Sequence, residues 1–315
     1  MSVLAEPHLA YVERVERRLA GAVGENGRVS EAGGQTLRSG GKRLRPLLVY
    51  LSAPTAGRDT DAVVSAGCAV ELVHMATLVH DDQLDAAPLR RGRPTVWSTH
   101  GPVVATATGD HLFAGAFAEL ARSGDMRAVG LLADACLALA RGEILQRAQA
   151  GQVDTTVEQY LERCRLKTGR LFAAATMLGG LLGGLDDRGL AALSRFGESL
   201  GVAFQIADDL LDCDGDPETT GKPLGTDLLD GTISLPLLLA ARRDREVRRV
   251  LLRGAGPEDV LPTLARVAAS GALEQAGEEA RRLAADAEQS LAGLDHRVEV
   301  ELLRAAVRTA VERER

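Results

Sequence analysis

The stretch HDDQLD, residues 80–85, has the spacing D-D-x-x-D, and the same spacing returns in ADDLLD, residues 207–212. Both stretches lie in apolar surroundings whose periodicity predicts helices. On a helix, residues four apart share a face and lie about 6 Å apart along the axis, so the first and last aspartates of each stretch point the same way. Three carboxylates on one turn repel one another, which predicts that the two turns face each other and hold cations.

The ligand type indicates which cation is held. Aspartate oxygens are hard ligands, and no set of His and Cys accompanies them. Mg²⁺ commonly takes one or two carboxylates and completes its shell with phosphate oxygens and water. The sequence therefore predicts a magnesium site. Its candidate carboxylates are Asp81, Asp82, Asp85, Asp208, Asp209 and Asp212.

Composition narrows the class of protein. The 315 residues are 45% hydrophobic but only 3% aromatic, so the core must consist mainly of Leu, Ala and Val, which favours helices. The net charge of -7 argues against a nucleic-acid-binding protein. The four scattered cysteines, without a CxxC pair, predict free thiols in a reducing cytoplasm. Neither a signal peptide nor an uncharged apolar stretch long enough to span a membrane is apparent, so we expect a cytoplasmic protein.

Helical periodicity dominates the chain, and alternating β-branched runs are nearly absent. The segments 60–85, 125–150 and 187–212 are long and mostly apolar, as the central helices of a bundle are. No linker or repeat divides the chain, which predicts one all-α domain. The other predicted helices cover 6–23, 44–56, 103–122, 156–166, 169–184, 234–242, 245–254, 258–270, 273–291 and 298–313.

Each aspartate stretch ends a predicted helix and opens into a polar loop. Residues 86–101 are rich in Pro, Gly and Arg, and residues 214–231 are rich in Gly, Pro and Asp. The carboxyl end of a helix carries partial negative charge, so carboxylates there need a bound cation even more.

Two short basic segments accompany the aspartates: SGGKRLRP at residues 39–46 and PLRRGRPT at residues 88–95. Taken alone, the first reads equally as a solvated turn and the second as charge neutralisation beside Asp85. Taken together with a magnesium site, they fit a diphosphate whose remaining oxygens are covered by Lys and Arg. A second diphosphate fits near Lys42. No nucleophile with an adjacent base is apparent, so we expect metal-assisted ionisation of a diphosphate in an apolar cavity.

The chain resembles the trans-isoprenyl diphosphate synthases, the polyprenyl synthetase family. The resemblance covers about residues 38–240 and rests on motifs in the family order: GGKRLRP, ELVHMATLVHDDQLD, LRRGRPT, KTG, FQIADDLLDCDGD and GKPLGTDL. It implies a single-domain all-α isoprenoid-synthase bundle over residues 1–315, with a deep central cavity and peripheral C-terminal helices over 242–315. It also implies a homodimer with about three Mg²⁺ per active site. The implied reaction is head-to-tail condensation of isopentenyl diphosphate with an allylic diphosphate, and we expect the product to pass to membrane enzymes.

The resemblance also implies roles for individual residues. It implies Asp81, Asp85 and Asp208 as direct metal ligands, with Asp82 and Asp212 supporting the metal site. The implied isopentenyl diphosphate site consists of Lys42, Arg45, His74 and Arg91. The implied allylic site consists of Arg90, Lys167, Thr168, Gln205 and Lys222, with Lys167 also taking part in catalysis. One position departs from the family: Thr232, in GTISLP, stands where the family commonly has a lysine, so the allylic diphosphate loses one cation.

Product length depends on the helix that leads into Asp81. Bulky aromatics about one turn before this aspartate commonly block short products in the family, but Ala76 and Thr77 are small, and Val73 further along is not bulky. One helical turn advances about 5.4 Å, close to one isoprene unit, so we expect a product of roughly C30 to C45, such as a quinone side chain. Phe113 and Phe117 are candidates for a deeper floor of the cavity. The alternative is a C15 or C20 product, if another helix closes the cavity sooner.

Other classes of protein share parts of this pattern. A class I terpene cyclase also has aspartate-rich metal sites, but it holds no second diphosphate. The non-catalytic subunit of a heteromeric synthase typically lacks the aspartate clusters, and both clusters are present here. The catalytic subunit of such a heteromer remains an open alternative.

Overall fold

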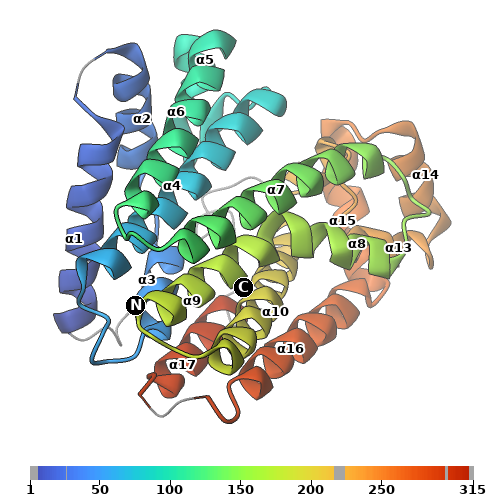
Figure 1. The fold of residues 1–315 in the computed structure, drawn as a ribbon. Coiled ribbons are helices and arrows are strands. Elements are labelled where there is room, and N and C mark those ends of the chain that lie inside the picture. Colours follow the sequence, from blue (N-terminus) through green and yellow to red (C-terminus); the bar gives the residue numbers. More distant parts are fainter. Residues whose placement is uncertain (1–5, 26, 216–223, 295–296, 312–315) are drawn as a thin grey trace. The chain divides into compact units, whose positions relative to one another are not determined.

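The computed structural model describes all residues except 1–5, 26, 216–223, 295–296 and 312–315 (Figure 1). The all-α prediction is confirmed: the described residues are helical apart from turns, loops and one two-residue hairpin. Along the first half of the chain, the elements are α1 (Glu6–Val23), α2 (Arg28–Arg38), α3 (Leu44–Ser52), α4 (Asp61–Leu84), β1 (Leu89–Arg90), β2 (Arg93–Pro94), α5 (Val96–His100), α6 (Pro102–Ala121) and α7 (Met126–Gln149). They are followed by α8 (Val157–Cys164), the π-helix η1 (Arg165–Gly169), α9 (Arg170–Leu182), α10 (Asp187–Asp214), α12 (Thr226–Leu229), α13 (Leu235–Ala241), α14 (Arg245–Arg253), the 3₁₀-helix η2 (Pro257–Asp259), α15 (Val260–Ala269), α16 (Ala272–Ser290) and α17 (Val300–Val311).

The chain forms two compact units, and each unit draws on three separate segments. Unit 1 consists of Met1–Cys136, Phe172–Ser194 and Gly293–Leu303, and unit 2 consists of Leu137–Leu171, Arg195–Ala292 and Arg304–Arg315. Four of the described helices, α7, α9, α10 and α17, begin in one unit and end in the other. The first aspartate stretch belongs to unit 1 and the second to unit 2. The division into a core over 38–240 and a peripheral layer over 242–315 stays a prediction.

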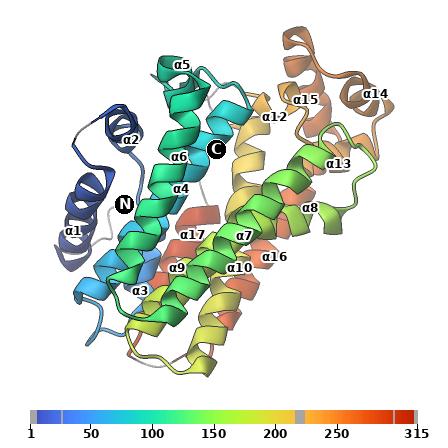
Figure 2. The same cartoon turned by 45° about the horizontal axis from the view of Figure 1, so that its top comes forward.

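In unit 1, α4 is the central element and runs beside α6 (Figures 1 and 2). It begins where the Thr60 side chain accepts a hydrogen bond from the Val63 N–H, an ordinary N-cap. Most of its apolar residues are buried, with Leu84 at its end exposed, and Gly67 lets α1 approach closely, because a Cβ there would lie 2.1 Å from the Tyr11 hydroxyl oxygen. Among the described helices, α4 alone is long and apolar enough to cross a membrane, but 78% of that window is buried inside the protein. This burial is that of a core helix.

In unit 2, α8 begins with a capping box that the sequence TTVEQ encodes. The Thr156 hydroxyl accepts from the Gln159 N–H at 3.2 Å, and the Gln159 side-chain oxygen accepts from the Thr156 N–H at 2.8 Å. The helix then buries Tyr160 and Leu161 in a core shared with α10, α13, α15 and α16. This core contains Ile206, which immediately precedes the second aspartate stretch.

The segment directly after α8 differs from the secondary structure predicted from the sequence. Instead of the predicted break between 156–166 and 169–184, the chain continues through η1, a π-helix. Gly142 of α7 faces it, and a Cβ at Gly142 would lie 2.6 Å from the Lys167 backbone nitrogen. The glycine therefore allows a close approach of α7 to the segment that carries Lys167 and Thr168. π-Helical turns are frequent at functional sites.

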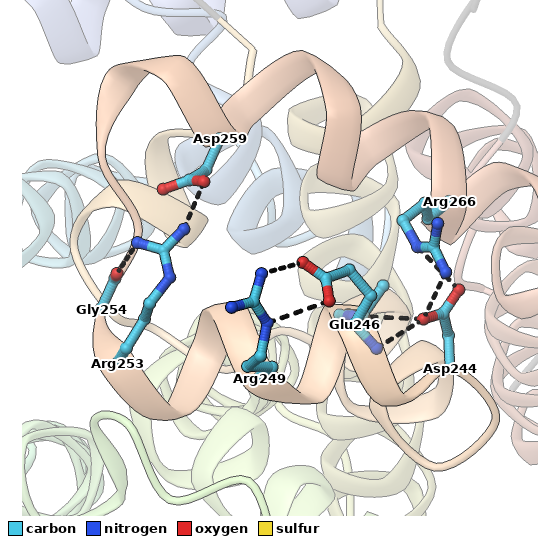
Figure 3. Close-up of polar contacts among 8 residues, drawn as sticks. Asp244, Glu246, Arg249, Arg253, Gly254, Asp259 and Arg266 are labelled. Carbon is cyan, nitrogen blue, oxygen red and sulfur yellow. Dashed lines mark hydrogen bonds and ion pairs between the residues drawn. The ribbon is translucent and has the colours of Figure 1, made fainter.

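The charged C-terminal region is built on surface ion pairs, which Figure 3 shows for α14 and α15. Asp244 caps α14 by accepting from two backbone N–H groups and also pairs with Arg266 of α15. Arg253 of α14 pairs with Asp259, which lies just before α15. Hydrogen bonds from these arginines and backbone groups lower the pKa values of both aspartates. The contacts fix the α14–α15 turn, but exposed pairs of this kind stabilise little.

Three described helices were not predicted: α2, α5 and α12. Two adjacent glycines lower the helix propensity of α2, yet Gly33 is selected by packing, because a Cβ there would lie 3.0 Å from a Val23 methyl group. The predicted helix 44–56 is too long: α3 ends at Ser52, since Ala53 precedes Pro54 and adopts an extended conformation with ψ 137°. The hairpin β1–β2 turns through Arg91 and Gly92, both at positive φ, as a tight two-residue hairpin requires.

Candidate active site

The first aspartate stretch forms the last turn of α4, where its three carboxylates have different surroundings. Asp85 is exposed at the C-cap and Asp81 is half-buried, whereas Asp82 is only 5% exposed. The Asp82 carboxylate accepts a hydrogen bond from Arg90 Nε at 2.6 Å. Burial raises the pKa of Asp82, and the guanidinium of Arg90 partly offsets this effect. Asp82 therefore anchors the β1–β2 hairpin, while Asp81 and Asp85 share the more open side of the turn.

The second stretch repeats this division in the final turns of α10. Asp208 and Asp212 are half-buried, whereas Asp209 is 5% exposed. Burial raises the pKa of Asp209, against the hydrogen bonds that its carboxylate accepts from Gln205 and Tyr160. Asp212 accepts from the backbone N–H groups of Thr226 and Asp227 at 3.0 and 3.1 Å, which ties α10 to α12.

Four arginines of unit 1 act electrostatically on His74. Burial lowers the pKa of His74 well below its ordinary value of 6.5, and Arg45 and Arg91 lower it further, with smaller effects from Arg90 and Arg43. His74 is therefore neutral at pH 7. The Arg91 side chain donates to the Gly40 carbonyl, which joins the hairpin to the GGKRLRP segment. Among the residues of the implied isopentenyl diphosphate site, Arg45, His74 and Arg91 thus lie together, with Lys42 exposed in the adjoining loop.

Arg45 and Arg43 differ in their surroundings, although only Leu44 separates them in the chain. The Arg45 guanidinium stacks on the Phe172 ring, 4.7 Å from its centroid. Arg43 is buried and adopts a left-handed φ of 48° at the start of α3. It pairs with Glu16 of α1 at 2.5 Å and with Glu71 of α4 at 2.9 Å. Arg43 therefore holds the basic loop against α4, one turn from His74.

In unit 2, two residues of the implied allylic site, Thr168 and Gln205, are linked to Asp209 by hydrogen bonds, and Lys167 pairs with Glu143. The Thr168 hydroxyl donates to Gln205 Oε1 at 2.8 Å, and Gln205 Nε2 donates to Asp209 at 3.0 Å. Lys167 Nζ lies 2.5 Å from the Glu143 carboxylate. Burial would raise the pKa of Glu143, but pairing with Lys167 and hydrogen bonds from Lys167 and Arg147 outweigh it and lower the pKa. Glu143 therefore holds the Lys167 ammonium on the side of α7.

The other positions considered for the allylic site are Arg90, Lys222 and Thr232. Arg90 lies in unit 1, where its Nε is bound to Asp82. Lys222 lies outside the described residues. Thr232 is half-buried and its backbone N–H donates to the Asp227 carbonyl, so its loop is tied to α12.

The carboxylates fit Mg²⁺ by the chemistry of their donors. No group of three His, Cys, Asp or Glu side chains in the described part of the chain is close enough together to hold a metal ion. Each unit instead offers two carboxylates, four residues apart on one helix face, beside a buried aspartate that has other partners. One or two carboxylates completed by phosphate oxygens and water is a common magnesium environment. The site therefore fits Mg²⁺ that binds together with a diphosphate.

Comparison with known proteins decides the family. The Polyprenyl synthetase family profile matches residues 27–261. The chain belongs to the polyprenyl synthetase family. It is 39% identical over 266 residues to "Heptaprenyl diphosphate synthase component 2" of Geobacillus stearothermophilus, covering 84% of this chain and 82% of the relative. It is 43% identical over 206 residues to "Geranylgeranyl diphosphate synthase" of Mycobacterium tuberculosis, covering 64% and 59%.

Solved structures agree with this assignment. The polyprenyl synthase of Caulobacter crescentus, complexed with calcium and isoprenyl diphosphate, matches with a TM-score of 0.91 and 34% identity, over 97% of this chain and 95% of that one. The fold is thus that of the isoprenoid-synthase bundle, and this polyprenyl synthetase is a prenyltransferase.

The residues predicted to set product length are all in unit 1. Val73 and Ala76 are fully buried, and Thr77 is half-buried with its hydroxyl donating to the His74 carbonyl at 2.8 Å. Phe113 is half-buried, and its ring lies 5.8 Å from the His80 ring. Phe117 is half-buried on the same helix. Their role in this polyprenyl synthetase stays a prediction.

Sequence reasoning missed the residues that hold the polyprenyl synthetase motifs in place. They come from elements distant in the chain, and spacing gives no sign of their partners. A usable signal was a charged or hydroxylated side chain on an otherwise apolar helix face. The missed residues are Glu71, Glu143, Tyr160 and Arg163, and the buried pairing of the motif residue Arg43 with Glu71 was not predicted either.

Proposed function

We propose that this polyprenyl synthetase condenses isopentenyl diphosphate with an allylic diphosphate, head to tail, in a magnesium-dependent reaction. The observation that carries the proposal is the guanidinium cluster around neutral His74. His74 and the GGKRLRP segment belong to unit 1, whereas Lys167, Thr168 and Gln205 belong to unit 2. Two separate sets of donors for anions suit two diphosphate substrates. A terpene cyclase has only one diphosphate to hold.

Each group of residues has a defined task in this reaction. Asp81 with Asp85, and Asp208 with Asp212, would hold Mg²⁺, which supplies charge stabilisation to the departing diphosphate. Lys167, whose ammonium pairs with Glu143, supplies positive charge for diphosphate oxygens. Arg45 and Arg91 bind the second diphosphate, and neutral His74 adds a hydrogen-bonding partner without further charge.

We propose a product longer than C20, roughly C30 to C45, because Val73 and Ala76 leave the relevant face of α4 without bulky groups. The name of one relative, heptaprenyl diphosphate synthase component 2, falls within this range, whereas the name of another, geranylgeranyl diphosphate synthase, corresponds to the shorter alternative. We further propose a cytoplasmic enzyme that passes its product to membrane enzymes. A C15 or C20 product is the alternative.

We propose that two copies of the chain associate. Large apolar side chains are exposed at the start of α6 and of α7, where Val103 is 80% exposed and Met126 77% exposed. The words "component 2" in the name of a relative make a heteromeric partner the alternative. Light scattering on the purified chain, with activity measured on the same sample, separates the two cases: a heteromeric subunit is inactive alone.

The function is tested with the purified chain, Mg²⁺, isopentenyl diphosphate and C10, C15 or C20 allylic primers, with products separated by chromatography. Asp81→Ala and Asp208→Ala should each remove nearly all turnover while the fold is kept, because these carboxylates repel one another without metal. Asp154→Ala is the control, since Asp154 is an exposed partner of Arg248. Near-normal turnover in either site variant, or turnover that survives EDTA, contradicts the magnesium assignment.

A further inference from the structure

The buried aspartate of the second stretch is surrounded by donors. Asp209 Oδ2 accepts from the Tyr160 hydroxyl at 2.7 Å and from the Leu235 N–H at 3.4 Å, and Oδ1 accepts from Gln205 Nε2 at 3.0 Å. These contacts come from α8, from the start of α13 and from α10 itself. Asp209 therefore joins three elements of unit 2 at a position next to Asp208.

Tyr160 is itself held in place. Its ring is fully buried and lies 5.2 Å below the guanidinium carbon of Arg163. Arg163, also buried, donates to Gln149 Oε1 at 3.0 Å and to the Ile233 carbonyl at 2.7 Å. The Tyr160 hydroxyl is thus a fixed donor, because neither its ring nor the arginine above it has room to turn away.

The hydrogen bonds around Gln205 have a defined direction. Its NH₂ group donates to the Asp209 carboxylate, so its side-chain oxygen is turned toward Thr168. The Thr168 hydroxyl donates to that oxygen at 2.8 Å. A single chain of hydrogen bonds therefore runs from Thr168 through Gln205 to Asp209, and Tyr160 closes its far end.

Asp209 also fixes the rotation of α10. Neighbouring residues on a helix are about 100° apart around its axis, so a turn of the helix at Asp209 moves Asp208 and Asp212 by the same angle. Tyr160 donates to Asp209, the one carboxylate of the stretch that points into the core. By fixing Asp209, it also fixes the directions of Asp208 and Asp212.

We propose that Tyr160 is a positioning residue of the active site: through Asp209 it orients the carboxylates of Asp208 and Asp212 and the allylic-site pair Thr168 and Gln205. This inference rests on the proposed function for its kinetic meaning. It assigns Tyr160 to the allylic and metal half of the reaction, and not to the isopentenyl diphosphate half, which lies in unit 1.

The test is Tyr160→Phe, which removes one oxygen and keeps the ring. Tyr50→Phe is the matched control, because Tyr50 is also fully buried and donates to an aspartate, Asp59, at 3.3 Å in unit 1. We expect Tyr160→Phe to lower kcat by about tenfold to 100-fold, since small misplacements of reacting groups have effects of this size. We also expect a rise in KM for the allylic substrate and in the Mg²⁺ concentration for half-maximal rate, with KM for isopentenyl diphosphate unchanged.

A second measurement does not depend on turnover. The rise in melting temperature on adding Mg²⁺ with inorganic diphosphate should shrink in Tyr160→Phe and persist in Tyr50→Phe. If Tyr160→Phe keeps both the kinetic constants and this rise, or if the two variants lose activity in parallel, Tyr160 has only a structural role. If the wild type makes no prenyl product but shows the melting-temperature rise, the proposed function fails while the diphosphate measurement still decides the role of Tyr160. No rise in the wild type overturns the inference as well.

Discussion

Replacement of Arg43 by methionine should destabilise unit 1 strongly and affect one substrate more than the other. The Arg43 and Glu71 side chains are 6% and 5% exposed, and Arg43 Nη1 lies 2.9 Å from Glu71 Oε1. Arg43→Met leaves the Glu71 carboxylate buried without its partner, which costs about 3–5 kcal/mol in measured cases. The Glu16 side chain is 40% exposed, so water screens its interaction with Arg43, and this pair contributes little to the free energy of unfolding. The left-handed backbone at residue 43 is equally strained with arginine or methionine, so it cancels.

The assay is urea unfolding of the wild type, Arg43→Met, and a double variant that also carries Glu71→Met. The double variant should regain most of the stability, because replacing both members of a buried pair by apolar groups is often nearly neutral. Arg282→Met is the surface control: its partners Glu279 and Asp286 are partly exposed, and solvent screening keeps the loss to about 1 kcal/mol or less. A loss below about 1 kcal/mol for Arg43→Met, or a double variant as unstable as the single one, would refute this reasoning.

The kinetic consequence follows from the position of Arg43 between Lys42 and Arg45. Since Arg43 holds this loop against α4, Arg43→Met should raise KM for isopentenyl diphosphate more than KM for the allylic substrate. Equal changes in both constants would mean that the loop does not serve one substrate.

Three further predictions concern single residues. Ala76→Phe should shorten the product if Ala76 lines the product path; if it only packs in the core, the larger ring lowers stability by about 1–3 kcal/mol and leaves product length unchanged. Thr232→Lys should lower KM for the allylic diphosphate by restoring a cation, and an unchanged KM would place this side chain away from the diphosphate. The pKa of His74 is lowered by burial and nearby guanidinium groups, so the unfolded chain binds a proton below pH 6.5 that the folded chain does not. The stability due to neutral His74 is therefore present above pH 6.5 and lost as pH falls below it. Urea unfolding at pH 7.5 and 5.5 should show that the free energy of unfolding falls less in His74→Gln than in the wild type. Equal falls in both proteins would contradict this reasoning.

Helices with a strong apolar period and polar ends were predictable from the sequence. The predicted 6–23 and observed Glu6–Val23 coincide, because the period of buried residues is written locally along α1. In contrast, α2 was missed since Gly33 and Gly34 weaken the local signal, while the tight packing that requires Gly33 involves Val23 and Leu112. The π-helix η1 likewise depends on its close approach to Gly142, which no local pattern reports.

The candidate site divides in the same way. The all-α class, the family and the paired carboxylates of each D-D-x-x-D stretch could be predicted from the amino-acid sequence, because i and i+4 positions on a helix share a face whatever surrounds them. Long-range packing was needed to show that Asp82 and Asp209 turn inward, that Glu143 holds Lys167, and that Tyr160 closes the network at Asp209. These pairings join residues 8, 24 and 49 positions apart. Burial makes each of them necessary, since a charged or polar group taken out of water must find a partner, and packing alone chooses which one.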